Sequence, residues 1–224
     1  MRQRVFISRD ISKERRQAYE EKFSIELLPL SLISFDACPK ITLPDFDMVF
    51  FYSKTAVHYF IQTYGLHYLK GKKTGTLGFS AKKELKKAGV EADFCGDGDP
   101  QSVQVALSKY AANQRVLFPR AKISKRSLQG EDKGYTCIDC IVYNNYISAN
   151  ITIPEADIYL FTSPLNVQSY LKNKGRKNTI TLAIGKTTEK ELLSSGFNKV
   201  YRSETSSESD IIEKAVTILN QTKH

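Results

Sequence analysis

The chain has 224 residues, of which 41% are hydrophobic and 25% charged, a balance typical of folded globular proteins and unlike that of disordered or fibrous chains. Its 33 lysines and arginines outnumber its 24 acidic residues, which gives a net charge of +9. Such a charge attracts anions, and the partner could be nucleic acid, an acidic membrane surface or a small polyanion. The alternative is that the surplus lysine serves only solubility. No apolar stretch approaches the roughly 20 residues of a membrane span, and the basic start is not followed by the apolar core of a secretory signal, so we expect a cytoplasmic protein.

Short β-rich runs alternate with helical stretches through the first half of the chain. The runs at residues 5–8, 48–52 and 76–78 are predicted strands. The stretch 80–89 carries helix signals, because it has a serine near its start and a glycine at its end. The acidic, glycine-rich segment 96–100 is predicted to be a turn that caps the next helix, in preference to a metal loop.

The second half of the chain repeats the first. Residues 157–171 align with residues 47–61, with aspartate, phenylalanine, serine and valine in matching places, and further matches follow in the same order along the chain. This spacing is far longer than solenoid repeats of about 20 to 50 residues, so we predict one duplicated α/β unit and two similar lobes. The remaining matches align 78–85 with 185–192, the glycine at 89 with the glycine at 196, and 4–9 with 115–120. The predicted strands of the second half are 116–118, 158–161 and 181–184.

Two long apolar runs, at residues 24–35 and 135–153, do not fit the alternation and are predicted to be crossover strands. A strand of about twelve residues spans roughly 40 Å, enough to leave one lobe and enter the other. We therefore predict two similar three-layer α/β/α lobes with parallel sheets, formed by tandem duplication with swapped segments and joined by two long β-strands. The predicted lobes comprise residues 1–32 with 150–224, and residues 36–146, with linker strands near 30–36 and 143–150.

Cys137 and Cys140 have the spacing of half a zinc site or a redox pair. They fall in a predicted strand, where residues three apart point to opposite faces, and no second Cys/His pair completes four ligands. We interpret them as buried small hydrophobic residues. The sequence also has no Walker loop, no Gly-x-Gly-x-x-Gly and no arrangement of Ser-His-Asp or Cys-His type, so it predicts no metal site and no covalent mechanism.

The turns that follow the predicted strands carry hydroxyls, glycines or cations. Ligands of parallel α/β sheets lie beyond the carboxyl ends of the strands, where helix N-termini present unpaired N–H groups. A serine or threonine at any one of these points is also an ordinary helix cap, whereas six such turns together favour an anion with several charged groups. The turns are 8–9, 52–55, 78–80, 119–122, 161–164 and 185–188.

Six segments carry the most telling residues of the chain: Val5-Phe-Ile-Ser-Arg9, Asp47-Met-Val-Phe-Phe-Tyr-Ser-Lys-Thr-Ala-Val57, Val116-Leu-Phe-Pro-Arg120, Ile141-Val-Tyr143, Asp157-Ile-Tyr-Leu-Phe-Thr-Ser-Pro164 and Ile184-Gly-Lys-Thr-Thr188. In their order and spacing these segments resemble the uroporphyrinogen-III synthase family, and the match covers nearly the whole chain.

The resemblance implies two lobes joined by a pair of strands, with hydroxymethylbilane bound in the cleft between them and cyclised with loss of water and inversion of ring D. It implies no cofactor and no metal, a monomer, and neither nucleic acid nor membrane as partner. Tyr143 aligns with a family tyrosine thought to assist departure of the hydroxyl; a strand tyrosine packed at the lobe junction is the other interpretation. The expected substrate-binding residues are Arg9, Ser53, Lys54, Ser80, Arg120, Lys122, Thr162, Ser163, Thr187 and Thr188.

The chain departs from the family pattern at two points. Ala81 stands where a threonine is common, although Thr188 is kept at the matching place of the second half, and Ala121 replaces a frequent glycine. Two alternatives therefore stay open: a non-catalytic two-lobed module that binds polyanions or nucleic acid, and a paralogue that has the fold without the activity.

Overall fold

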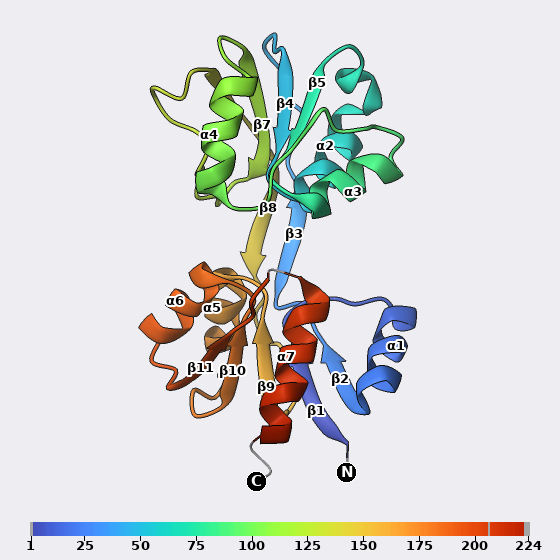
Figure 1. The fold of residues 1–224 in the computed structure, drawn as a ribbon, viewed down its shortest axis with the longest axis vertical. Coiled ribbons are helices and arrows are strands. Elements are labelled where there is room, and N and C mark those ends of the chain that lie inside the picture. Colours follow the sequence, from blue (N-terminus) through green and yellow to red (C-terminus); the bar gives the residue numbers. More distant parts are fainter. Residues whose placement is uncertain (1, 206, 222–224) are drawn as a thin grey trace. The chain divides into compact units, whose positions relative to one another are not determined.

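The computed structural model describes residues 2–205 and 207–221 and divides into two compact units (Figure 1). Unit 1 comprises residues 1–34 and 146–224, and unit 2 comprises residues 35–145. The chain passes from unit 1 to unit 2 within strand β3 (Ile33–Ala37) and returns within strand β8 (Thr136–Ile147). No helix of the described residues is long and apolar enough to cross a membrane.

Unit 1 is built on a parallel sheet in the order β11-β10-β9-β1-β2. Side chains of β1 alternate between its faces: Val5 and Ile7 pack under α1 and α7, whereas Phe6 packs under α5 and α6. Helices thus cover both faces and give three layers. The elements are β1 (Gln3–Ile7), α1 (Lys13–Phe23), β2 (Ile25–Pro29), β9 (Ile158–Phe161), α5 (Pro164–Lys172), β10 (Ile180–Ala183), α6 (Lys186–Ser194), β11 (Lys199–Arg202) and α7 (Glu208–Gln221).

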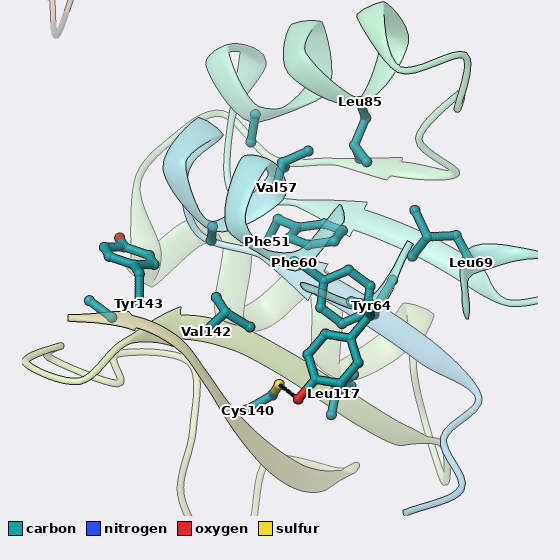
Figure 2. Packing of buried hydrophobic residues seen from close by; sticks show 14 of the residues in the cluster. Phe51, Val57, Phe60, Tyr64, Leu69, Leu85, Leu117, Cys140, Val142 and Tyr143 are labelled. Atoms are coloured by element: carbon teal, nitrogen blue, oxygen red, sulfur yellow. Dashed lines mark hydrogen bonds between the residues drawn. The ribbon is translucent and has the colours of Figure 1, made fainter. Parts of the chain in front are cut away.

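Unit 2 contains a second sheet in the order β3-β8-β7-β4-β5-β6, in which the pairs from β8 to β6 are parallel. On one face, Phe51 packs with Val57 and Leu85 under α2 and α3 (Figure 2); on the other, Phe50 packs with Val103 under α4. The elements are β4 (Met48–Phe51), α2 (Lys54–Tyr64), the 3-10 helix η1 (Leu66–Leu69), β5 (Lys73–Thr76), α3 (Phe79–Lys87), β6 (Phe94–Cys95), α4 (Pro100–Tyr110) and β7 (Arg115–Ala121).

The predicted duplication with swapped segments is confirmed strand by strand. The order β6-β5-β4-β7-β8 in unit 2 corresponds to β11-β10-β9-β1-β2 in unit 1, so each sheet pairs strands from both sequence repeats. The hydrogen bond that joins the two central strands of each sheet is also repeated. Asp47 accepts a hydrogen bond from the backbone N–H of Arg115 at 2.8 Å, and Asp157 accepts one from the backbone N–H of Arg4 at 2.7 Å. Both copies therefore keep the same register between their two central strands.

The helices α3 and α6 repeat the same ends. Gly78 and Gly185 are their N-caps in extended conformation, and Gly89 and Gly196 follow their C-termini with φ of 82° and 86°. Those left-handed values favour glycine, because a Cβ would be strained there. The helix predicted at residues 80–89 is confirmed, although it begins one residue earlier, at Phe79.

The first crossover run is two strands, so the prediction of one continuous strand over residues 24–35 was wrong. β2 pairs with β1 as far as Pro29, and the N–H of Leu30 donates the last hydrogen bond of this ladder, to the carbonyl of Ile7 at 3.0 Å. Beyond it, the Ser31 hydroxyl donates to the carbonyl of Ile33 at 2.8 Å. This local bond holds the turn that separates β2 from β3.

The predicted capping turn and the opposite faces of the two cysteines are confirmed, whereas the predicted burial is confirmed for Cys140 and only in part for Cys137. Asp99 caps α4 and accepts a hydrogen bond from the N–H of Ser102 at 3.2 Å, so the acidic turn is a helix cap. Cys137 packs on the α4 face of the sheet, whereas Cys140 is buried on the α2 face beside the hydroxyl of Tyr64 (Figure 2). The two thiols therefore cannot share a ligand.

Candidate functional site

Five of the six predicted turns lie where parallel strands of the two sheets end, whereas the turn predicted at 119–122 was wrong, because residues 119–121 belong to β7. In unit 1 the neighbouring strands β10, β9 and β1 lead into the turns at Gly185, Thr162 and Ser8. In unit 2 the neighbouring strands β5 and β4 lead into the turns at Gly78 and Ser53. Because parallel strands end at the same edge, each unit gathers its own set of helix N-termini there.

Ser8 and Thr162 hold two turns of unit 1 together. The Ser8 hydroxyl accepts a hydrogen bond from the N–H of Thr162 at 2.9 Å, and the Thr162 hydroxyl donates to the carbonyl of Ser8 at 3.0 Å. Ser8 is only 1% exposed. The Thr162 hydroxyl is thus occupied by the backbone and fixes the shape of the site.

Ser163 and Ser53 are N-caps of matching helices, α5 and α2. Both have extended backbones, with φ/ψ of −165°/159° and −155°/160°. Ser163 accepts from the N–H of Asn166 at 3.3 Å, and Ser53 accepts from the N–H of Ala56 at 3.2 Å. Both side chains are partly exposed, so capping leaves their hydroxyls within reach of a ligand. The cap interpretation and the binding prediction are compatible.

The turn at the start of α6 exposes one of its two predicted threonines. Thr187 is exposed, whereas Thr188 is 1% exposed and its N–H bonds the carbonyl of Gly185 at 3.1 Å. Ala81, at the equivalent place on α3, is buried to the same extent. The departure from the family pattern at Ala81 therefore removes no surface hydroxyl. Ser80 and Lys54, in the first turns of α3 and α2, are exposed.

Arg9 lies just beyond β1 and pairs with Glu208 of α7 at 3.4 Å. Glu208 also pairs with Arg15 of α1 at 2.6 Å, and its side chain is only 10% exposed. One carboxylate thus neutralises one of two guanidinium groups. The residual positive charge remains beside the Ser8 turn and can attract an anion.

Tyr143 of β8 is a largely buried phenol beside the cap of α2. It is 8% exposed, and its ring stacks on Tyr59 with 5.1 Å between centroids and meets the edge of Phe35 at 5.7 Å. Burial raises the pKa of Tyr143, and a hydrogen bond with the Ser53 side chain offsets part of that rise. The phenol is therefore protonated at neutral pH and can donate a hydrogen bond.

Arg120 is the second-last residue of β7, and its side chain lies against the loop that follows this strand. It is 8% exposed, contacts Asp139 at 2.6 Å, and donates to the carbonyls of Ala121 and Lys122 at 2.9 and 3.2 Å. The backbone N–H of Lys122 in turn donates to the carbonyl of Tyr143 at 2.9 Å, and the side chain of Lys122 is exposed. Arg120 thus shapes the loop that presents Lys122; direct substrate binding by either residue stays a prediction.

Two hollows of unit 2 lie away from these turns. One is lined by residues of α2 and α3, including Val57, His58 and Lys87, and the other by Phe46, Tyr68 and further residues around them. Neither contains a predicted site residue. Local concavity within unit 2 therefore gives no support to the predicted turns, whose case depends on hydrogen-bonding groups and charge.

The comparisons with known proteins agree with the fold of the two units. The family model described as uroporphyrinogen-III synthase HemD matches residues 18–213. The chain belongs to that family. It is similar in fold to the crystal structure of uroporphyrinogen-III synthetase from Helicobacter pylori, with 21% identity over 97% of this chain and 100% of the other and a TM-score of 0.73.

A second similar structure is a mutant uroporphyrinogen III synthase from the extremely thermophilic bacterium Thermus thermophilus, with 16% identity over 98% of this chain and 99% of the other and a TM-score of 0.59. At such identities these likenesses show the fold alone. No curated protein matches the chain significantly.

Within the family fold, three groups at these edges escaped the sequence analysis. Glu208 pairs with Arg9, Asp139 pairs with Arg120, and Asn166 contacts both Thr162 and Ser163. Of the three, only Asn166 lies close in sequence to its partners. Its position three residues after the cap serine is the one feature of the sequence that could have indicated its role. In residues 2–205 and 207–221, no cluster of three or more His, Cys, Asp or Glu side chains could hold a metal ion.

Proposed function

We propose that this protein is a uroporphyrinogen-III synthase that cyclises hydroxymethylbilane to uroporphyrinogen III with inversion of ring D and loss of water. The proposal needs no cofactor, and it assigns the protein to the cytoplasm as a monomer, with neither nucleic acid nor membrane as partner. The observation that carries it is the buried Tyr143 beside the Ser53 cap, in a chain of this family.

The charge of the protein supports a polyanionic substrate. Hydroxymethylbilane carries eight carboxylates, and the chain carries a net charge of +9. Exposed or partly exposed donors stand at the carboxyl edges of both units: Ser53 and Ser80 in unit 2, and Ser163 and Thr187 in unit 1. We propose that the turns at these edges bind carboxylates of the substrate, with N–H groups and hydroxyls as donors.

Tyr143 would act on the terminal hydroxymethyl group. The C–O bond breaks, the departing oxygen takes the phenolic proton and leaves as water, and the chain is left as an azafulvene cation. The substituted carbon of ring D attacks the azafulvene carbon and gives a spiro intermediate. The older bond from this ring D carbon to the methylene of ring C then breaks and leaves a second azafulvene cation at ring C. The free carbon of ring D attacks that methylene, which re-attaches the ring inverted, and the proton that this carbon loses restores the phenol. A phenol with a raised pKa is a weak acid, so most of the selectivity must come from the conformation in which the substrate is held.

The test is the isomer of the product. Hydroxymethylbilane is generated in situ, the purified protein is added, and type I and type III products are separated after oxidation. The proposal expects mainly type III product at a rate proportional to protein concentration. If only the spontaneous type I isomer forms while the protein binds RNA in a salt-sensitive manner, the non-catalytic polyanion-binding alternative is correct.

A further inference from the structure

Asn166 is a buried amide that the catalytic proposal does not use. It lies in the first turn of α5 and is 2% exposed. Its Nδ2 donates to the hydroxyl of Thr162 at 3.2 Å and to the hydroxyl of Ser163 at 2.9 Å. Among the described residues its Oδ1 has no hydrogen-bond partner. A buried amide with an unsatisfied oxygen is costly, which indicates a constraint beyond packing.

The neighbours of Asn166 determine which way its amide points. The single proton of the Thr162 hydroxyl is donated to the carbonyl of Ser8 at 3.0 Å. The atom of Asn166 that faces this hydroxyl must therefore be a donor, which is Nδ2 and not Oδ1. Turning the amide over would place two acceptors against each other.

This orientation decides what Ser163 can do. Its hydroxyl oxygen receives the N–H of Asn166 at 3.3 Å and the Nδ2 of Asn166 at 2.9 Å, so both lone pairs are occupied. Its proton has no acceptor among the described residues, and the side chain is partly exposed. Ser163 is left as an obligatory donor, suited to an anion and unsuited to a cation or an N–H group.

The matching helix in unit 2 lacks this device. Ser53 accepts from the N–H of Ala56, and an alanine side chain offers no second donor. The Ser53 hydroxyl instead interacts with Tyr143. The orienting amide is therefore particular to α5 and is not a requirement of the repeated fold.

We propose that Asn166 is a positioning residue that fixes the Ser163 hydroxyl as a hydrogen-bond donor to a carboxylate of the substrate. This inference rests on the proposed function, and it deepens it by assigning one carboxylate contact to a two-residue unit. Asn166 itself does not touch the substrate.

The variants Asn166→Ala, Ser163→Ala and the double variant test the coupling. Loss of one hydrogen bond to a charged group should raise KM for hydroxymethylbilane by about tenfold in each single variant, with kcat unchanged. In the double variant KM should rise no further than in Ser163→Ala alone, because Asn166 acts only through Ser163. Asn166→Asp keeps the shape but accepts the Ser163 proton, and should raise KM at least as much as Asn166→Ala.

Ser169→Ala is the matched control, since Ser169 is a buried residue of the same helix whose hydroxyl donates to the carbonyl of Leu32. It should lower the thermal unfolding temperature while leaving KM unchanged. Unchanged KM in Asn166→Ala, or an added loss of affinity in the double variant, overturns the proposal and leaves Asn166 a structural residue.

A second readout separates this inference from the proposed function. Uroporphyrin III carries eight carboxylates, and its binding can be followed by fluorescence without any turnover. If the wild type fails to cyclise but binds uroporphyrin III, the same pattern of about tenfold weaker, non-additive binding supports the role of Asn166. If the wild type binds no uroporphyrin III, or all variants bind it equally, the inference is wrong.

Discussion

Replacing Tyr143 by phenylalanine removes one oxygen atom and leaves the ring in place. The stack on Tyr59 and the edge contact with Phe35 involve the ring alone and survive the change. What is lost is the interaction of the phenol with the Ser53 side chain that offsets part of the rise in its pKa. The free energy of unfolding should therefore fall by about 0.5–1.5 kcal/mol, within what a folded domain of this size tolerates.

The loss of rate should be much larger than the loss of stability. Proton donation by a positioned side chain contributes about 10²–10⁴-fold to a reaction rate. Burial raises the pKa of Tyr143, which makes it a weaker acid and places it at the lower end of that range. We expect kcat for formation of type III product to fall about 100-fold, which corresponds to about 2.7 kcal/mol of activation free energy.

Tyr135→Phe is the control for loss of a buried phenol. Tyr135 is also 8% exposed, and its hydroxyl donates to the carbonyl of Leu128 at 2.6 Å on the other face of the sheet. The assay measures type III product in single turnovers, with urea unfolding of both variants alongside. A Tyr143→Phe variant that turns over at the wild-type rate, or a Tyr135→Phe variant that slows as much, would refute the assignment of Tyr143 as proton donor.

Three stability predictions follow from unit 2. Asp139→Ala leaves the buried guanidinium of Arg120 without its carboxylate and should lower the free energy of unfolding by about 3 kcal/mol in urea titrations. A loss under about 1 kcal/mol would mean that the backbone carbonyls alone stabilise the buried guanidinium. Burial opposes ionisation of Asp139, but hydrogen bonds from Arg120 and Gln129 outweigh this effect and lower the pKa of Asp139 below its ordinary value of 3.8. The stabilising contribution of Asp139 should therefore be complete above pH 3.8 and disappear as the pH falls through the lowered pKa. The variant Asp139→Asn should lack this pH dependence. Gly96→Ala should cost about 1–3 kcal/mol, since its Cβ would lie 2.2 Å from a methyl of Val103 and 2.6 Å from a carbonyl oxygen; a wild-type melting temperature would contradict this.

The duplicated fold could be predicted from the sequence because the repeat preserves what the backbone needs. Ser53 and Ser163 recur where a helix requires a cap, and Gly89 and Gly196 recur where a helix end requires a positive φ. These requirements are local, so residue type and spacing express them directly. The same logic found the turns that hold the candidate site.

The contacts that determine what those turns can bind are long-range, and the sequence analysis missed them. Ser8 and Thr162 follow strands β1 and β9, which pair only in the tertiary fold, and no local pattern indicates that the Thr162 hydroxyl donates to a backbone carbonyl. Arg120 was predicted from its place after a strand, but its partner Asp139 belongs to the neighbouring strand β8. Side-chain availability depends on packing between elements, which residue spacing does not encode.

The two repeats keep one backbone and differ in chemistry, and that difference is informative about the proposed reaction. Beside the cap of α5 in unit 1 lie Thr162 and Asn166, whereas beside the matching cap of α2 in unit 2 lie Ala56 and a tyrosine. A symmetric pair of sites would treat both ends of a linear polyanion alike, yet the proposed reaction treats them differently, because one end of hydroxymethylbilane loses its hydroxyl and ring D at the other end attacks. Under the proposed function, a tyrosine at one cap and an oriented serine hydroxyl at the matching cap supply such a difference, and a duplicated scaffold can acquire it by changing side chains alone.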